Sequence, residues 1–361
     1  MKRLSSPAVV LSQLGRAVGA GALALGLHAA DPSSPVILDE FISETPGVPS
    51  VHASTIAETE NGLVAAWFGG TEEGALDVSI WLTRQEGGVW TPPVEVANGY
   101  DAREHRRFPC WNPVLFTRAN GDLLLFYRVG PSPSRWWSYV RLSKDGGRTW
   151  ERIRRLPSGY LGPIKNPPIE LPNGILLCGS STEDAGWRVH LEWTEDPFRA
   201  WFKSKPLNDA FVLPAIQPAV LRYDENTFQI LCRTKRGRIA EAWSTDGGNS
   251  WSELRRTKLP NPNSGLHAIR LQDGRVLMAY NHTERGRHLL NLATSPDGRQ
   301  WNAVAVLEND PGHEYSYPTL LQTSDGRVHV VYTWRREKIK HVLLEPEKFV
   351  ERPIIDGRWP E

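Results

Sequence analysis

Two aspartates lie in nearly identical octapeptides, SKDGGRTW at residues 143–150 and STDGGNSW at residues 244–251. A well-placed carboxylate can act as a general acid or base, which makes Asp145 and Asp246 candidates for catalysis. The neighbouring residue types favour a structural role, because Asp accepts hydrogen bonds from amides two residues on and Gly adopts positive φ. A catalytic aspartate has no reason to recur in every repeat of the sequence, whereas a structural turn does. We therefore interpret the octapeptide as a tight hairpin turn closed by tryptophan.

Further polar side chains lie in four short sequence segments whose residue types do not fit the pattern of a regular strand. Basic residues and amides outnumber acids in them, which suits an anionic sugar such as a uronic acid. The candidates are Lys165 and Asn166 in GPIKNPPIE, Asn263, Ser264 and His267 in NPNSGLHAI, Arg106, Arg107, Trp111 and Asn112 in REHRRFPCWNP, and Trp334, Arg335, Lys340 and His341 in YTWRREKIKH. Trp111 could stack on a sugar face, but each string also has a plain loop interpretation, since PNPN suits a turn.

Degenerate copies of the octapeptide recur along the chain, and their spacing gives the length of a sequence repeat. Its copies end at Trp90, Trp150, Trp201, Trp251 and Trp301, which are 60, 51, 50 and 50 residues apart. A fixed period near fifty predicts stacked or radially arranged supersecondary units. Short segments between the copies, such as GLVAAWFGG and RVHVVYTWRR, are rich in β-branched and aromatic residues and read as strands.

Four strands in a unit of about fifty residues are typical of a β-propeller blade. Five marked units cover roughly residues 50–308, and a sixth, from His313 to Glu345, has strands but no octapeptide. We expect SPVILDEFI, residues 34–42, to supply its outer strand and so to remove an open edge. The sequence predicts an all-β fold: one six-bladed propeller of four-stranded antiparallel blades over residues 31–361. The starts of its innermost strands would converge at a central channel.

The composition excludes several classes of protein. The 361 residues carry a formal net charge of +1, so no overall field favours nucleic acid or a membrane surface. Cys110, Cys178 and Cys232 lack metal-ligand spacing, and we expect three buried thiols, or one disulfide plus a free thiol in an exported chain. We find no nucleotide, haem or metal motif and expect no cofactor and no metal ion. No apolar run is long enough to span a membrane.

The N-terminus resembles a secretory signal peptide. Two positive charges precede an apolar run from Ala17 to Leu27, and small residues follow near Ala30. We interpret residues 1–30 as a signal peptide, with a disordered tail or a misassigned start codon as the alternative. The first interpretation predicts a periplasmic or secreted protein, and the second a cytoplasmic one.

The pattern S-x-D-G-G-x-T-W resembles the Asp-box, or bacterial neuraminidase repeat, of sialidases. Longer strings, among them HASTIAETENGLVAAWFGGTEEGALDV, GPIKNPPIELPNG and EYSYPTLLQTSDGRVHVVYTWRREKIKHV, are similar to a bacterial and plant branch of sialidase family proteins. The resemblance covers residues 40–345 and implies a sialidase-like six-bladed propeller. It also implies a tyrosine nucleophile, a nearby glutamate, a carboxylic acid/base and three arginines that clamp the substrate carboxylate.

The resemblance assigns the catalytic roles to individual residues. Tyr315 takes the position of the nucleophile, and Tyr317 is a close alternative. Glu73, in FGGTEEGALDV, takes the position of the acid/base, with Glu72 and Asp77 as nearby alternatives. A glutamate is adequate as a general acid if burial raises its pKa.

Two positions match the arginine clamp and two others depart from the family pattern. Arg233 and Arg287 take the second and third arginine positions, whereas His52 stands where sialidases have the first arginine. Gln217 stands where sialidases have the glutamate that activates the tyrosine, and Gln cannot act as a base. His52 could itself serve as an acid/base or as a cationic ligand.

The leading hypothesis is a sialidase-like exo-glycoside hydrolase that removes a terminal acidic sugar, sialic acid or another anionic sugar, from a glycan or oligosaccharide. A non-catalytic carbohydrate-binding propeller is the second hypothesis, favoured by His52 and Gln217. A uronate-specific polysaccharide lyase is the third, with Tyr315 and His52 sharing the proton transfer. The expected substrate-binding residues are Arg233, Arg287, Gln217, Lys165, Asn166, Asn263, Trp111 and Arg335.

Overall fold

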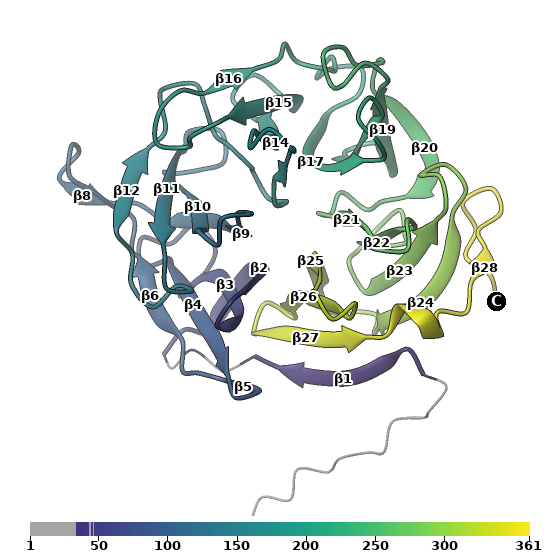
Figure 1. Cartoon of the computed structure of the whole chain (residues 1–361), viewed down its shortest axis with the longest axis horizontal. Helices are drawn as coiled ribbons and strands as arrows, with labels where there is room; N and C mark the ends of the chain where they lie inside the picture. The colour runs from purple at the N-terminus through teal and green to yellow at the C-terminus, as the bar shows by residue number, and fades with distance from the viewer. Residues whose placement is uncertain (1–33, 43–44, 46) are drawn as a thin grey trace, which may run out of the picture. The chain divides into compact units, whose positions relative to one another are not determined.

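The computed structural model describes residues 34–42, 45 and 47–361, and these residues form an all-β architecture. Six antiparallel sheets of four or five strands are arranged as blades around a central axis (Figure 1). The predicted six-bladed propeller is therefore confirmed. Within the described part, one 3-10 turn, η1 (Pro346–Lys348), is the only helix, and none is long and apolar enough to cross a membrane. The predicted signal peptide, residues 1–30, lies outside the described residues and stays a prediction.

The first three blades follow one another along the chain. Blade 1 consists of β2 (Ser50–Thr59), β3 (Gly62–Gly70), β4 (Ser79–Glu86), β5 (Val89–Trp90) and β6 (Val94–Ala97). A ribbon of β7 (Tyr100–Asp101) and β8 (Arg106–Arg107) leads to blade 2, with β9 (Cys110–Thr117), β10 (Leu123–Val129), β11 (Trp137–Ser143) and β12 (Arg152–Arg155). Blade 3 consists of β13 (Ile169–Glu170), β14 (Leu176–Thr182), β15 (Arg188–Thr194) and β16 (Phe202–Lys203).

The remaining blades complete the ring. Blade 4 consists of β17 (Ala215–Arg222), β18 (Phe228–Thr234), β19 (Arg238–Ser244) and β20 (Arg255–Pro260). Blade 5 consists of β21 (His267–Arg270), β22 (Val276–Tyr280), β23 (Leu289–Ser295), β24 (Asn302–Asn309) and β28 (Arg352–Pro353). Blade 6 consists of β25 (Tyr315–Gln322), β26 (Val328–Trp334), β27 (Lys338–Leu344) and β1 (Val36–Phe41).

The ring closes through the N-terminal strand, as the sequence predicts. Strand β1 pairs antiparallel with β27 and becomes the outermost strand of blade 6 (Figure 1). The last blade is thus built from both ends of the described chain, which covers the edge that β27 would otherwise expose. The innermost strand β2 contacts both β9 and β25, so blades 1, 2 and 6 are neighbours.

The core is divided among the interfaces between blades. Six clusters of buried apolar side chains lie between neighbouring blades, including the one between blades 6 and 1. Each sheet therefore buries both faces, which explains why the strands read as nearly continuous apolar runs. Cys110, Cys178 and Cys232 are buried free thiols within these clusters, in agreement with the expected three buried thiols.

The octapeptides are turns between the third and fourth strands of a blade. Asp145 accepts hydrogen bonds from the Thr149 backbone N (2.8 Å) and Thr149 Oγ1 (2.6 Å), and the Ser143 hydroxyl accepts one from Gly147 N (2.8 Å). Ser244, Asp246 and Ser250 repeat the same pattern. The closing tryptophans pack on the clusters between blades. The structural interpretation of the octapeptide is therefore confirmed.

Candidate functional site

We call the end of the propeller where the innermost strands begin the top, and the end where they finish the bottom. Near the top, the backbone of three innermost strands is left-handed at Asn112 (φ 38°), Gln217 (φ 57°) and Tyr317 (φ 55°), and each of these residues precedes a proline. Ala53 in β2 has the same conformation (φ 56°) without the proline. The strand pairing slips at all four positions, as in β-bulges. Bulges re-aim side chains, and here they turn polar groups toward the axis.

Tyr317 is at the centre of the polar groups gathered at the top. Its phenolic oxygen accepts hydrogen bonds from Arg233 Nη1 (2.6 Å) and from Gln217 Nε2 (3.2 Å). The imidazole of His52 lies against the phenol ring, with 4.3 Å between ring centroids. Donors aimed at an oxygen stabilise negative charge that develops on it during a reaction. We call His52, Gln217, Arg233 and Tyr317 the tyrosine cluster.

Arg233 is the cation of this cluster that is best placed to meet an anionic ligand. Its Nε donates to Asn263 Oδ1 (2.7 Å), and its guanidinium lies over the Trp187 ring at 5.1 Å from the centroid. Among the described residues it forms no ion pair, although it is only 7% exposed. A buried guanidinium without a carboxylate partner favours an incoming one.

His52 is neutral at neutral pH. Burial is the main cause that holds the pKa of its imidazole well below the usual value, and the positive charges of Arg336, Arg287, Arg233 and Lys165 act in the same direction. Its Nδ1 hydrogen bonds to Thr333 Oγ1 (2.9 Å). His52 is therefore not a cationic clamp, and its neutral ring can accept a proton but is a weaker base than a free imidazole.

Lys165 and Asn166 support the bulges from below. Lys165 Nζ donates to Asn166 Oδ1 (3.0 Å) and to the carbonyls of Leu266 (3.2 Å) and Pro318. Asn166 Nδ2 donates to the carbonyl of Gln217 (3.1 Å). Burial, followed by the charge of Arg233, lowers the pKa of Lys165 well below its usual value. Both side chains therefore fix backbone geometry at the site instead of facing a ligand.

A chain of ion pairs runs along one side of the tyrosine cluster. Arg287 Nη1 lies 2.8 Å from Glu314 Oε1, and Arg336 bridges Glu314 (3.1 Å) and Glu73 (2.5 Å). Burial alone would raise the pKa of Glu314, but Arg287, Arg336 and Ser316 outweigh it and hold this pKa below its usual range. The charge of Arg287, next to the site, is thus already balanced by Glu314. Glu73 lies at the outer end of this row of ion pairs.

The structure separates Tyr315 and Arg335 from the tyrosine cluster, contrary to the expected grouping. Tyr315 is 1% exposed and packs between blades 5 and 6, where its hydroxyl donates to Asp310 Oδ2 (3.1 Å) and accepts from Arg335 Nε (3.2 Å). Arg335 also pairs with Asp310 (2.7 Å). Residues two apart in a regular strand share a face, but the left-handed backbone at Tyr317 breaks this alternation. The alternative, Tyr317, is the tyrosine that lies among Arg233, Gln217 and His52.

Trp111 also differs from its expected role as a stacking platform. It is 6% exposed, donates from Nε1 to the Gly130 carbonyl (2.9 Å), and contacts the rings of Phe68 and Trp136. A Cβ added at Gly74 would lie 3.5 Å from it, so Trp111 supports the loop that carries Glu73. The Trp111 ring is therefore buried among its neighbours and does not present an open face on which a sugar could stack.

Glu183 is a candidate that the sequence reasoning missed. It follows β14 at the top of blade 3, and burial raises the pKa of its carboxyl, although Arg233, Trp187 and Lys235 oppose the rise. It lines a cavity of about 530 Å³ together with Trp136, Trp137 and Tyr160. The acidic pair in STEDAGW, between two predicted strands, was the signal that could have found it.

The six blades and the repeated Asp-box turns define a propeller of the Asp-box class. A family model described as a BNR repeat-like domain matches residues 61–330, and the chain belongs to this family. No curated protein matches the chain.

Solved structures resemble the chain at low identity. A protein of unknown function from Dyadobacter fermentans DSM 18053 superimposes with a TM-score of 0.73 and 19% identity, over 87% of this chain and all of that one. A Hadza microbial sialidase gives 0.68 and 16%, over 83% of this chain and 66% of the sialidase. An α-L-arabinanase from Penicillium chrysogenum gives 0.65 and 16%, over 87% and 99%. These similarities show the fold.

Proposed function

We propose that the protein is an exo-acting glycoside hydrolase that removes a terminal acidic sugar from a glycan. The observation that carries this proposal is the tyrosine cluster: a phenolic oxygen held by Arg233 Nη1 at 2.6 Å, with a neutral imidazole against its ring. Sialidases are the retaining glycosidases that use tyrosine as nucleophile. The similarity to a microbial sialidase supports the same reaction type, while the departures at His52 and Gln217 favour an anionic sugar other than the usual one.

In this proposal the residues divide the reaction into two steps. Arg233 binds the sugar carboxylate, and Tyr317 attacks the anomeric carbon while its phenolic proton passes to His52. The glycosidic C–O bond breaks, and the leaving oxygen takes a proton from a carboxylic acid. The resulting carboxylate then takes a proton from water, whose oxygen attacks the anomeric carbon. The bond between this carbon and Tyr317 breaks, the sugar is released, and the phenolic oxygen takes its proton back from His52. Gln217 orients the phenol but takes no proton.

Two carboxyls at the top are candidates for the general acid. Glu183 has a pKa raised by burial, which keeps a larger fraction protonated near neutral pH. Glu73 is paired with Arg336 and more exposed. We propose Glu183 as the acid, with Glu73 as the alternative that the family resemblance suggests. If Glu183 is the acid, the rate falls as pH rises through its pKa, and Glu183→Gln abolishes this alkaline decline.

A uronate-specific lyase is the second candidate, because Gln217 provides no carboxylate base while His52 lies neutral against Tyr317. In that reaction one of the two takes the proton next to the sugar carboxylate and the other gives a proton to the leaving oxygen. The product then contains a new carbon–carbon double bond. The N-terminal segment, read as an export signal, would place either activity outside the cytoplasm.

A glycan screen tests both reactions. Oligosaccharides capped with sialic acids or uronic acids are incubated with the protein, and released sugars are measured by mass spectrometry and by ultraviolet absorbance. Release of an intact acidic monosaccharide with addition of water supports the hydrolase. A product that is lighter by one water and absorbs in the ultraviolet supports the lyase. Binding without any turnover across the screen refutes both and leaves a carbohydrate-binding propeller.

A further inference from the structure

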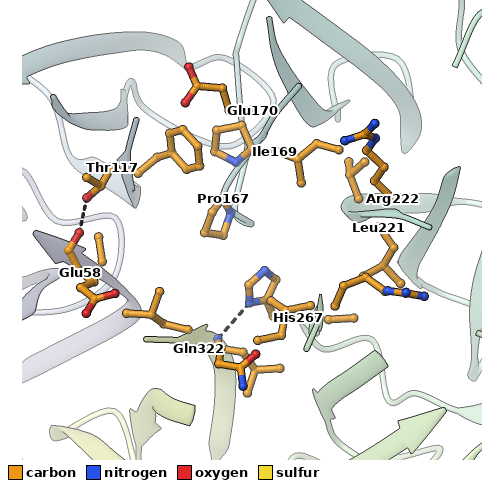
Figure 2. Close-up of a pocket in the computed structure, with 18 of the residues that line it drawn as sticks. Glu58, Thr117, Pro167, Ile169, Glu170, Leu221, Arg222, His267 and Gln322 are labelled. Carbon is orange, nitrogen blue, oxygen red and sulfur yellow. Dashed lines mark hydrogen bonds between the residues drawn. The ribbon is translucent and has the colours of Figure 1, made fainter. Parts of the chain in front are cut away.

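Two cavities lie outside the tyrosine cluster, at opposite ends of the propeller. The bottom cavity has a volume of about 890 Å³ and lies among the ends of the innermost strands (Figure 2). Acids at its mouth are bound within the protein: Ser324 donates to Glu58 (2.9 Å), and Arg118 pairs with Glu170 (2.8 Å). None of the four residues of the tyrosine cluster lines the bottom cavity, so it does not extend the proposed reaction site.

The second cavity, which we call the upper cavity, lies at the top between blades 2 and 3. It has a volume of about 530 Å³, within the range of small-molecule sites. The loop between β10 and β11, the segment after β12 and the end of β14 line it. Glu183, the acid of the proposed reaction, is one of its lining residues.

Trp187 connects the upper cavity with the tyrosine cluster. The guanidinium of Arg233 lies 5.1 Å from the centroid of the Trp187 ring, and its Nη1 donates to Tyr317. The Trp187 side chain also hydrogen bonds to the Glu183 carboxyl, on which the charge of Arg233 acts as well. Glu183 therefore stands between the upper cavity and the residues that would hold the acidic sugar.

Trp136 gives the upper cavity an aromatic face. The side chain is half-buried, yet it belongs to none of the six apolar clusters between the blades. Among the described residues its one ring contact is with Trp111, at 6.0 Å between centroids and 67° between planes, and no cation lies over it. The neighbouring Trp137 ring, in contrast, is covered by Arg155 at 4.4 Å. Trp136 therefore has a face left for a ligand.

The loop before β11 holds Trp136 in place. Gly130 has a φ of 154°, and a Cβ added there would lie 2.5 Å from Trp136 Cα, so the two ends of the loop lie against each other. Trp111 Nε1 donates to the Gly130 carbonyl (2.9 Å), and the Arg135 backbone N donates to the Ser132 carbonyl (2.9 Å). A loop that is already fixed loses little conformational freedom when a ligand binds, so Trp136 is preorganised for stacking.

Charges of both signs line the upper cavity, which favours a neutral ligand. The charged lining residues are Arg103, Arg154, Arg155, Glu183 and Asp184. Arg155 pairs with Asp101 (3.2 Å), whereas Arg154 forms no ion pair and no side-chain hydrogen bond within the described part of the chain. Two guanidinium groups thus face two carboxyls, and an ion of either sign would meet a like charge. Hydroxyl groups suit this lining, because each can donate to a carboxylate and accept from a guanidinium.

We propose that the upper cavity binds a neutral sugar residue, so that the substrate is an oligosaccharide in which an uncharged sugar follows the terminal acidic one. A C–H face of this sugar lies on Trp136, and its hydroxyls meet Arg154 and Asp184. This inference rests on the proposed function and adds the leaving group to it. When the glycosidic C–O bond breaks, its electron pair stays with the oxygen of the neutral sugar, which takes the proton of Glu183 and leaves as a free hydroxyl.

Binding of neutral sugars, which needs no turnover, tests the site. The full chain is titrated with cellobiose, maltose and lactose, and with sorbitol, a polyol that has hydroxyls but no ring, and saturation-transfer NMR follows binding. We expect at least one disaccharide to bind saturably and sorbitol not to bind, because only a sugar ring offers a C–H face to tryptophan. No saturable binding of any of the three disaccharides, or equal binding of sorbitol, would overturn the proposal.

Variants locate the bound disaccharide. Trp136→Ala should weaken its binding by about tenfold, and Trp136→Phe, which keeps a smaller ring, by only about threefold. Trp243→Ala is the matched control, because Trp243 is a half-buried tryptophan on β19 that does not line the upper cavity. It should bind as the wild type does, and so should Tyr317→Phe. Affinity that is unchanged in Trp136→Ala, or that falls in Tyr317→Phe instead, would place the sugar elsewhere and contradict the proposal.

Kinetics distinguish a failure of this inference from a failure of the proposed function. For an acidic sugar that the glycan screen identifies, the wild type should prefer its glycoside with a neutral sugar over its methyl glycoside, and Trp136→Ala should lose about tenfold of this preference in kcat/KM. Turnover with the same preference in Trp136→Ala as in the wild type refutes the neutral-sugar site alone. Disaccharide binding that depends on Trp136, without turnover of any glycan, supports the neutral-sugar site and refutes only the reaction.

Discussion

At the scale of single residues, two tyrosines of one strand have different environments. Tyr317 meets Arg233, Gln217 and His52 at the axis, whereas Tyr315 fills a blade interface and hydrogen bonds to Asp310. The chemistry of the site therefore depends on Tyr317 and on the donors that surround its oxygen. Among these donors, Arg233 has no carboxylate partner in the described chain, which makes it the residue on which recognition of an anion depends.

Arg233→Lys should weaken the binding of an acidic sugar by about tenfold or more while the charge stays the same. The reason is geometric: an ammonium cannot hold Tyr317, Asn263 and a carboxylate at once as a planar guanidinium does. The apparent affinity for the sugar, measured by calorimetry or as KM, checks this. Arg236→Lys, on the same hairpin but hydrogen-bonded to the Phe211 carbonyl, is the control. Equal affinity of Arg233→Lys and wild type would contradict the assigned role.

At the scale of elements, the blade uses its two ends differently. The octapeptide turns join the third and fourth strands, and their aspartates hold backbone amides and hydroxyls of the turn. Two left-handed residues near the start of the innermost strands, Gln217 and Tyr317, belong to the tyrosine cluster. Stability and chemistry are thus placed in different segments of the same repeat.

Asp145→Ala should lower the free energy of unfolding by about 1–2 kcal/mol, because the turn loses the hydrogen bonds to Thr149 N and Oγ1. Catalysis or ligand binding at the top should not change. Chemical denaturation followed by tryptophan fluorescence measures the first effect, and the glycan assay measures the second. Asp122→Ala is the control, because within the described residues its carboxylate bonds only to the Asn120 side chain in a neighbouring turn. A loss of activity without a loss of stability would revive the catalytic interpretation of the octapeptide.

The sequence allowed the fold to be predicted because its signals are local. A turn that recurs every fifty residues identifies the blades, and the run at residues 34–42 fits the missing strand. The site was only partly predictable, since the choice between Tyr315 and Tyr317 depends on a backbone bulge that strand alternation does not anticipate. Likewise, Trp111 and Lys165 are residue types that often bind ligands. In the folded protein both side chains are buried and hydrogen bond to backbone carbonyls, which the sequence does not reveal.

At the scale of the whole molecule, closure of the ring depends on contacts between the two ends of the described chain. Glu40 on β1 accepts hydrogen bonds from His341 Nδ1 and Trp90 Nε1, both at 2.9 Å. His341 Nε2 in turn lies 2.9 Å from His329 Nδ1, with the two rings stacked. This buried row joins the closing strand to blades 1 and 6, and it contains a pair of imidazoles that cannot both be protonated without losing their mutual hydrogen bond.

The propeller should lose stability as pH falls from about 6.5 to 4. Burial, with His341 nearby, lowers the pKa of His329 to about 4, so the folded state keeps it neutral while the unfolded state binds a proton below about 6.5. Since the unfolded state binds more protons in this window, the free energy of unfolding falls with decreasing pH, by up to about 1.4 kcal/mol per unit for this residue. Burial lowers the pKa of His282 to about 4 and acts in the same direction.

Denaturant titrations at several pH values between 7 and 4.5 measure this dependence. His329→Gln should show a shallower slope than the wild type, and His313→Gln, an exposed control, should show the same slope. A free energy of unfolding that stays constant over this range would contradict the neutral folded histidines.

The central claim is that Tyr317 is the reactive tyrosine of an acidic-sugar site. The most direct test is kcat/KM of Tyr317→Phe and of its strand neighbour Tyr315→Phe, measured on a glycan that the screen identifies as a substrate. We expect Tyr317→Phe to lose about a hundredfold or more, because the nucleophilic oxygen is removed, and Tyr315→Phe to stay within about threefold of the wild type. Turnover that survives in Tyr317→Phe, or that is lost only in Tyr315→Phe, would contradict the account.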